Sequence, residues 1–278
     1  MSKSFSGFAK SGNNLLVLDA LNLAFRWKHS GVTDFCSDYI NTVQSLARSY
    51  NCKKVLVAAD QGSSSYRKQL SPDYKQNRKD RFAQQTEAER IAFEEFFTEF
   101  QHTLDTLSSQ YPVLRFPGVE ADDIAAYVVS QRAKLGIDHT WLISSDRDWD
   151  LLIKSDVSRF SYVTRKEVTQ ENWHEHYEFA PEDYISIKCL TGDTGDNVAG
   201  VPGIGPKRAA GLVCEYGSAW DIVANLPILG KKYKYIQDLN QSSELLQLNY
   251  KLMDLETHCC EAIGEANLTQ INEVLQLL

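Results

Sequence analysis

Nine acidic residues, scattered widely along a chain of 278 residues, are the first candidates for chemistry. Three of them crowd into GVEADD, where two carboxylates about 5 Å apart would repel by roughly 3 kcal/mol at an effective dielectric near 20. A helix N-terminus could absorb part of that repulsion. Clusters that contain only oxygen ligands also suit Mg²⁺ or Mn²⁺. The full set is Asp19, Asp60, Glu120, Asp122, Asp123, Asp146, Asp148, Asp193 and Asp196.

Three of these acids follow predicted strands. The apolar runs LLVL (15–18), VLVAA (55–59) and TWLIS (140–144) alternate with stretches typical of helices, which predicts an α/β fold with a mostly parallel sheet. Asp19, Asp60 and Asp146 come just after these runs. Because the carboxyl ends of parallel strands share one edge of a sheet, where ligands bind, we expect these side chains to converge there.

Taken singly, each acid also has an ordinary structural explanation. An aspartate after a strand is often a turn residue, SSDRD could cap the short helix WDLLI, and GDTGDN could form two tight turns. A Ca²⁺ loop is a further option, but the EF-hand spacing with its terminal glutamate is absent. The joint placement of all the acids around one predicted sheet edge favours a divalent-metal site.

A basic segment rich in aromatic residues lies between residues 61 and 101. Such a segment suits single-stranded nucleic acid, through phosphate contacts and base stacking. In isolation, a solvated charged loop is the alternative. The residues concerned are Arg67, Lys68, Lys75, Arg78, Lys79, Arg81 and Arg90, with Tyr66, Tyr74 and Phe82 among them.

The segment GVPGIGPKRAAGLV (200–213) combines glycines with a basic helix start. Backbone N–H groups at a glycine turn and a helix N-terminus can cradle a phosphate, and Pro206 is compatible with the first helical turn. A Walker A loop is excluded because no Ser or Thr follows Lys207. The alternatives are a helical hairpin packed through its glycines or contact with a DNA backbone, and the basic tip favours the latter.

The composition is that of an ordinary globular protein, with 43% hydrophobic and 24% charged residues. The net charge of −8 argues against nucleic-acid binding at first, but if nine acids belong to a metal cluster the remainder carries +1. No apolar run is long enough to span a membrane, and the polar N-terminus lacks a signal peptide's apolar centre. We therefore expect a cytoplasmic protein with a flexible tail over residues 1–14. Its six cysteines show no zinc-site spacing and are expected to be reduced.

The motifs VLDALN, VAAD, YKQNR, GVEADD, SSDRDWD, GDTGDN and GVPGIGPKR occur in the order found in the flap endonuclease, or 5′-nuclease, family. The chain resembles this family over about residues 15–260 and looks most like the phage enzymes of the T-five type. The resemblance implies a PIN-like/5′-nuclease fold with a helical arch. We expect an α/β core over 15–180 with the arch at about 66–105, then a helical DNA-binding region over 181–278. A helix-three-turn-helix is expected at about 193–217.

The resemblance also implies roles for individual residues. The nine acids match the family's metal ligands, for two or more Mg²⁺ or Mn²⁺ ions. Lys75 and Arg78 match cationic arch residues beside the scissile phosphate, and Tyr74 matches an aromatic that stacks on a base. The expected DNA contacts are Arg26, Tyr74, Lys188, Gly203, Gly205, Lys207 and Arg208.

The sequence departs from the family pattern in two places. Ala20 and Leu21 replace the usual Gly-Thr after the first aspartate, and Arg147 stands where glycine is common. An arginine between two metal ligands could alter the local charge or backbone geometry. The family also suggests a K⁺ ion at the glycine turn.

These features predict a structure-specific 5′ nuclease that hydrolyses DNA at 5′ ends and single-strand/duplex junctions in replication or repair, with metal-activated water. Lys75 could act electrostatically or, if its pKa is depressed, in proton transfer. The expected protein is a monomer that binds branched or 5′-ended DNA and works near replication proteins, in the host cytoplasm if phage-encoded. The alternatives are a PIN-like ribonuclease and a non-catalytic module that recognises branched DNA.

Overall fold

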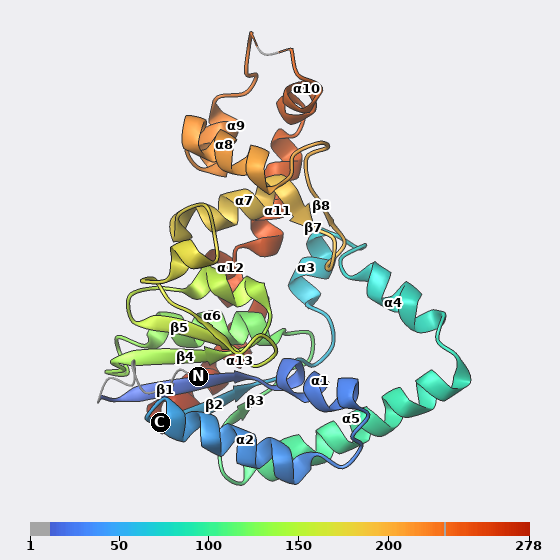
Figure 1. Ribbon diagram of the computed structural model, residues 1–278, viewed down its shortest axis with the longest axis vertical. Helices are drawn as coiled ribbons and strands as arrows, with labels where there is room; N and C mark the ends of the chain where they lie inside the picture. The colour runs from blue at the N-terminus through green and yellow to red at the C-terminus, as the bar shows by residue number, and fades with distance from the viewer. Residues whose placement is uncertain (1–11, 231) are drawn as a thin grey trace.

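A six-stranded sheet forms the centre of the computed structural model, which describes residues 12–230 and 232–278 (Figure 1). The predicted tail over residues 1–14 lies mostly outside these residues. The strand order is β3-β2-β1-β4-β5-β6, with every pair parallel except β5–β6. The strands are β1 (Asn14–Asp19), β2 (Cys52–Ala58), β3 (Val113–Leu114), β4 (His139–Ile143), β5 (Val157–Ser161) and β6 (Lys166–Val168).

Helices cover both faces of this sheet, so its central strands are buried on both sides. In β1, Leu16 and Leu18 face one hydrophobic cluster while Leu15 and Val17 face another, as the two-residue period of a strand requires. The first face is covered by α1 (Ala20–Ser30), α2 (Cys36–Ser49) and α5 (Glu87–Ser108). The predicted α/β architecture is confirmed.

The arch predicted at residues 66–105 stands away from the body of the molecule on one side (Figure 1). It consists of α4 (Gln76–Ala83) and the first half of α5, which begins with a capping box between Thr86 and Glu89. The short helix α3 (Ser65–Leu70) precedes it and packs against α11 and α12. The second half of α5 is part of the core, because Phe96, Phe100 and Leu104 are buried. The free part of the arch is therefore shorter than predicted.

A third hydrophobic cluster holds the helical region together. The helix-turn-helix consists of α7 (Tyr184–Thr191) and α8 (Pro206–Tyr216), separated by the hairpin β7 (Gly192–Asp193) and β8 (Val198–Ala199). Gly200 permits this close packing, since a Cβ there would lie 2.1 Å from the carbonyl oxygen of Thr191. The helices α9 (Ala219–Ala224), α10 (Lys234–Asn240) and α11 (Ser243–Met253) complete the region.

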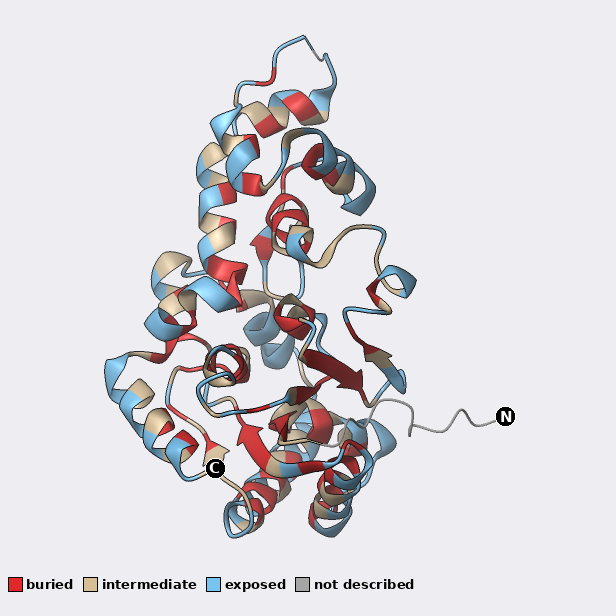
Figure 2. Cartoon of the chain, turned by 90° about the vertical axis from the view of Figure 1, so that its left-hand side faces the viewer, coloured by how far each residue is buried: buried red, intermediate tan, exposed pale blue. Residues whose placement is uncertain are grey.

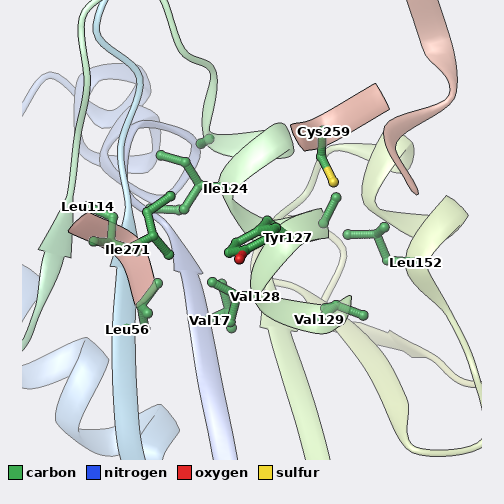
Figure 3. Close-up of a cluster of buried hydrophobic side chains, with 14 of the residues drawn as sticks. Val17, Leu56, Leu114, Ile124, Tyr127, Val128, Val129, Leu152, Cys259 and Ile271 are labelled. Carbon is green, nitrogen blue, oxygen red and sulfur yellow. The ribbon is translucent and has the colours of Figure 1, made fainter. Parts of the chain in front are cut away.

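The last two helices return to the sheet instead of continuing this region. Residues of α12 (Leu255–Ile263) and α13 (Glu265–Gln276) share one hydrophobic cluster with α6 (Ala121–Gln131) and with Leu15 and Leu56 of the sheet. Figure 3 shows Cys259 and Ile271 near core side chains such as Leu56, and in Figure 2 buried residues (red) recur along the strands and the helices. The helical region expected over 181–278 therefore has two parts, because its last two helices complete the hydrophobic core beside the sheet. In the described part of the chain, no helix is both long and apolar enough to cross a membrane.

Candidate active site

A cavity of about 290 Å³ lies at the carboxyl ends of β1, β2 and β4. It collects acids from segments far apart in the sequence, as the strand-end argument predicted. Besides the acids, Lys75 and Arg78 line it. The acidic side chains in its wall are Asp19, Asp60, Asp122, Asp146, Asp148, Asp193 and Asp196.

Asp19 and Asp60 are held in fixed positions by neutral donors. Asp19 is the last residue of β1 and caps α1, and its other oxygen accepts a 2.7 Å hydrogen bond from the hydroxyl of Ser144. Asp60 accepts a 2.8 Å hydrogen bond from the backbone N–H of Ala121. Burial, reinforced by the charge of Asp60, raises the pKa of Asp19 to about 8. Burial also raises the pKa of Asp60, although the charges of Lys75 and Arg78 oppose this shift.

Asp122 and Asp146 complete this half of the cavity. The carboxylate of Asp122 accepts a 2.6 Å hydrogen bond from the indole of the buried Trp149, and burial raises the pKa of Asp122 well above its usual range. Asp146 caps the 3₁₀ helix η2 (Arg147–Leu152) through the N–H of Asp148. The capping role considered from sequence is thus real, but it uses one oxygen and leaves the acid in the cavity wall.

In the other half of the cavity, the carboxylates form ion pairs with cationic side chains. The ammonium group of Lys188 lies 2.5 Å from Asp148 and 3.0 Å from Asp193. Burial raises the pKa of Asp148 to about 6, although Lys188 opposes this shift. Burial also opposes ionisation of Asp193, but the ion pair with Lys188 outweighs it and lowers that pKa. Lys188 was predicted to contact DNA, and the structure instead places its buried ammonium group between two acids.

These oxygen-rich walls have the donor chemistry of a site for a hard divalent cation. Among residues 12–230 and 232–278, no three acidic, histidine or cysteine side chains already stand in an arrangement that could hold an ion. The ion pairs explain part of this, because Lys188 and Arg78 engage three of the acids. The residues fit a divalent metal, provided that some carboxylates exchange a cationic side chain for the ion.

We expect the metal-free protein to lose stability as pH rises from 5 to 8. The pKa of Asp19 is higher in the folded chain, so the folded state binds more protons than the unfolded state between about pH 4 and 8, and the free energy of unfolding falls. The expected loss in EDTA is about 2 kcal/mol, measured by urea unfolding, and Mg²⁺ should restore it. Asp19→Asn should flatten the dependence. Stability that rises with pH over this range in EDTA would contradict the assignment.

The base of the arch is joined to the cavity by Glu120 and Asp196. Lys75 lies 2.8 Å from Glu120 and 3.5 Å from Asp196, and the hydroxyl of Tyr74 donates to both acids. Tyr74 is only 3% exposed and belongs to the helical-region core. Stacking of Tyr74 on a base stays a prediction, and it would require this covered ring to become accessible.

Lys75 has an unusual backbone conformation at the start of α4. Its φ of 55° lies in the left-handed region, and its N–H donates to the carbonyl oxygen of Asp196. Burial disfavours its charge, but the attraction of Glu120 and Asp196 outweighs burial and raises the pKa of Lys75 above its usual range. The hypothesis of a depressed pKa is therefore corrected. Arg78 is half exposed and pairs with Asp196 at 2.5 Å.

Two predicted ligands lie behind the cavity instead of in its wall. Glu120 is buried against Lys75 and the N–H of Ser64. Burial acts to raise the pKa of Glu120, but the charge of Lys75 outweighs burial and lowers this pKa. Asp123 is fully buried and forms a bidentate pair with Arg67 at 2.7 and 2.8 Å. In the metal-free protein Arg67 takes both oxygens of Asp123, so a role for Asp123 as a metal ligand stays a prediction. Glu120 and Asp123 of GVEADD are thus stabilised by different cations, whereas Asp122 faces the cavity.

Asp123→Asn is expected to destabilise the protein by about 3 kcal/mol, because it leaves the buried guanidinium of Arg67 without its charge partner. Metal affinity per folded molecule should stay within a factor of about two, since the side chain does not line the cavity. Chemical unfolding and Mn²⁺ titration measure the two quantities separately. A large loss of Mn²⁺ affinity with unchanged stability would reinstate Asp123 as a ligand.

The remaining predicted DNA contacts are distributed over two other surfaces. Arg26 stacks on Tyr162 at 4.5 Å and faces a separate cavity between α1 and α2. Gly203 and Gly205 form the exposed turn before α8, where Arg208 donates to the carbonyl oxygen of Gly203. Lys207 is exposed at the start of the same helix. The glycine turn and its basic tip are therefore accessible, whereas Arg26 does not reach the carboxylate cavity.

Sequence reasoning missed the residues that position the acids. Ser144, Trp149 and Arg67 each bond an acid of the cavity or of its back wall. Ser144 and Trp149 stand within the motif TWLISSDRDW, so their proximity to Asp146 was the available signal. The pairing of Arg67 with an acid 56 residues away had no signal in a single sequence.

Comparisons with known proteins agree with this fold and site. Residues 14–178 match the model of the 5′-3′ exonuclease N-terminal resolvase-like domain, and residues 179–273 match the 5′-3′ exonuclease C-terminal SAM fold. The flap endonuclease of Escherichia phage T5 is 43% identical, over 95% of this chain and 93% of that protein. The 5′-3′ exonuclease of Halalkalibacterium halodurans is 28% identical, over 92% of this chain and 88% of that protein.

Solved structures extend the likeness to three dimensions. A crystal structure of the phage T5 flap endonuclease in complex with DNA and metal ions superposes with a TM-score of 0.90 at 42% identity, covering 95% of this chain and all of that one. The chain thus belongs to the 5′-3′ exonuclease and flap endonuclease family. It is a metal-dependent, structure-specific 5′ nuclease, and the alternatives of a ribonuclease and a non-catalytic module are disfavoured.

Proposed function

We propose that the carboxylate cavity binds two or more Mg²⁺ or Mn²⁺ ions and hydrolyses DNA phosphodiesters at 5′ ends and at junctions between single strands and duplex. The observation that carries this proposal is the single cavity in which seven aspartates from remote segments meet Lys75 and Arg78. Some of these aspartates also cap helices or pair with cations, but the mutual repulsion of seven carboxylates at one strand edge opposes folding unless positive charge offsets it.

The two halves of the cavity differ in what they offer a metal. Asp19, Asp60, Asp122 and Asp146 form no ion pair within the described residues, so they are free to hold the first ion. Asp148, Asp193 and Asp196 would hold a second ion after releasing Lys188 or Arg78. A bound ion supplies a water of lowered pKa and neutralises phosphate charge.

Lys75 and Arg78 provide positive charge in the wall of the same cavity. Both line the cavity, and Asp196 pairs with both, which holds them beside the site where a phosphate would approach. Because the pKa of Lys75 is raised, it stays charged and acts as an electrostatic stabiliser of the transferring phosphate and the leaving oxygen. Glu120 serves as its positioning residue.

The remaining surfaces bind the DNA. The exposed glycine turn and the start of α8 present N–H groups together with Lys207 and Arg208, which suits the backbone of duplex DNA. The carbonyl oxygens of the same turn would hold a K⁺ ion. The exposed cations of the arch suit a single strand. We also propose that the protein acts as a monomer beside replication proteins in the cytoplasm, where its DNA substrate would be found.

An end-labelled 5′-flap substrate tests this proposed function. With Mg²⁺, the label should appear in a short product released at the junction, and EDTA should abolish cleavage. A matched RNA flap and a 3′-flap test the substrate and the polarity. Cleavage in EDTA, or equal cleavage of the RNA or of the 3′-flap, would overturn the proposal.

A further inference from the structure

A second cavity, of about 490 Å³, lies directly behind the wall of the carboxylate cavity. It opens between η2, α7 and the start of α8. Lys188 lines the second cavity, and its ammonium group contacts Asp148 and Asp193, which line the carboxylate cavity. The second cavity therefore extends from Lys188, beside the carboxylates, to Pro206 and Lys207 at the start of α8. Its wall includes Arg147, Tyr177, Phe179, Tyr184, Lys188 and Lys207.

The short helix η2 supplies side chains to both cavities. Asp146 and Asp148 line the carboxylate cavity, while Arg147, which lies between them in sequence, lines the second cavity. Arg147 thus places a positive charge in the second cavity, while its two neighbours in sequence face the carboxylate cavity. The acids do not neutralise it, since no ion pair joins Arg147 to either neighbour.

The polar groups of the aromatic wall are already engaged. The hydroxyl of Tyr177 donates to Asp150, and the hydroxyl of Tyr184 lies 3.5 Å from the carbonyl oxygen of Arg147. The ring Nε2 of His176 lies 3.0 Å from the carbonyl oxygen of Glu167. The two tyrosine hydroxyls of this wall therefore already have partners within the protein.

Two cations remain available. Arg147 and Lys207 are both exposed, and within residues 12–230 and 232–278 neither side chain forms a hydrogen bond or an ion pair. Most other cations around the active site are paired: Lys75, Arg78 and Lys188 all contact acids. The exposed Glu178 is the one acid in this cavity's wall. In a chain of net charge −8, two unpaired cations at one cavity mark a site for an anion.

We propose that Arg147 and Lys207 together bind one backbone phosphate of the DNA duplex between the scissile bond and the glycine turn. The guanidinium of Arg147 suits two phosphate oxygens at once, and the ammonium of Lys207 contributes a point charge. This contact sets the distance between the duplex and the carboxylates, so Arg147 is a positioning residue for the cleavage site. The inference rests on the proposed function, because it assumes DNA as the substrate.

Flap-duplex binding in EDTA, followed by fluorescence anisotropy at several salt concentrations, tests this inference without requiring cleavage. Arg147→Ala should weaken binding about tenfold and lower the slope of log affinity against log salt by about 0.9. Arg147→Lys should recover part of the affinity. The matched control is Arg48→Ala, an exposed arginine beside the amino-terminal end of β2 that removes the same charge.

Replacing single phosphates of the duplex with neutral methylphosphonates identifies the contact. At one position, the neutral linkage should weaken binding to the wild type clearly more than binding to Arg147→Ala or to Lys207→Ala, and the double variant should be the least affected by it. A salt slope equal to that of Arg48→Ala, or no position coupled to Arg147, would overturn the inference. Either result would leave the flap-cleavage test of the proposed function unaffected.

Discussion

Asp146→Asn is expected to reduce 5′-flap cleavage at limiting Mg²⁺ by about a hundredfold or more, because it removes one charge from the proposed first ion's ligands. The substitution removes the negative charge of Asp146 and keeps the shape of its side chain. Asp146 caps η2 through one side-chain oxygen, and asparagine caps helices equally well, so the local structure should persist. Raising the Mg²⁺ concentration should recover part of the lost activity, since the variant's main defect is weaker metal binding.

Asp254→Asn is the matched control for this prediction. Asp254 also caps a helix, α12, through the N–H groups of Glu256 and Thr257, but it does not line the carboxylate cavity. The same change of atoms should therefore leave cleavage within about twofold of the wild type. Wild-type turnover by Asp146→Asn at limiting Mg²⁺ would remove Asp146 from the ligand set.

Lys75→Ala should have a comparably large effect, but on turnover instead of affinity. The ammonium group lines the cavity and is held there by Glu120 and Asp196, so its loss removes preorganised charge from the transition state and should lower kcat by about a hundredfold or more. Lys207→Ala should instead raise the Kd for duplex and reduce its salt dependence, because Lys207 lies on the exposed surface at α8.

Two further variants separate charge from structure in this experiment. Lys75→Met keeps the volume of the side chain, and Glu120 retains Arg67, Ser64 and Tyr74 as partners, so this variant should fold and still lose turnover. Lys79→Ala removes an exposed lysine from the same arch helix outside the cavity wall and should change kcat little. Identical kcat and Kd effects in the Lys75 and Lys207 variants would contradict the division of roles.

The parts of the fold that depend on local pattern could be predicted from the sequence. The three apolar runs match β1, β2 and β4 to within a few residues, and the strand-end argument brought Asp19, Asp60 and Asp146 to one edge. This prediction succeeds because the carboxyl ends of parallel strands lie at one edge of the sheet, so residues that directly follow the strands are brought together there. The glycine turn before α8 was likewise predictable, since Gly203 and Pro206 carry local conformational signals.

The parts that depend on long-range partners could not be predicted. Nothing local distinguishes Asp122 from Asp123, yet one faces the cavity and the other pairs with Arg67 from a different helix. The same limit applies to Tyr74, whose burial depends on the helical-region core, and to α12, which returns to the sheet. Each outcome is decided by tertiary contacts between distant segments, and these contacts leave no local pattern in a single sequence.

The most direct test of the central claim is the position of Mn²⁺ in anomalous difference maps from crystals soaked with the ion. The account predicts a peak within the carboxylate cavity, with Asp19, Asp60, Asp122 and Asp146 among its nearest residues and oxygen ligands at about 2.1 Å. A second peak near Asp148 and Asp193 should accompany displacement of Lys188. Crystals that bind Mn²⁺ only outside this cavity, or that bind none at saturating concentration, would contradict the account.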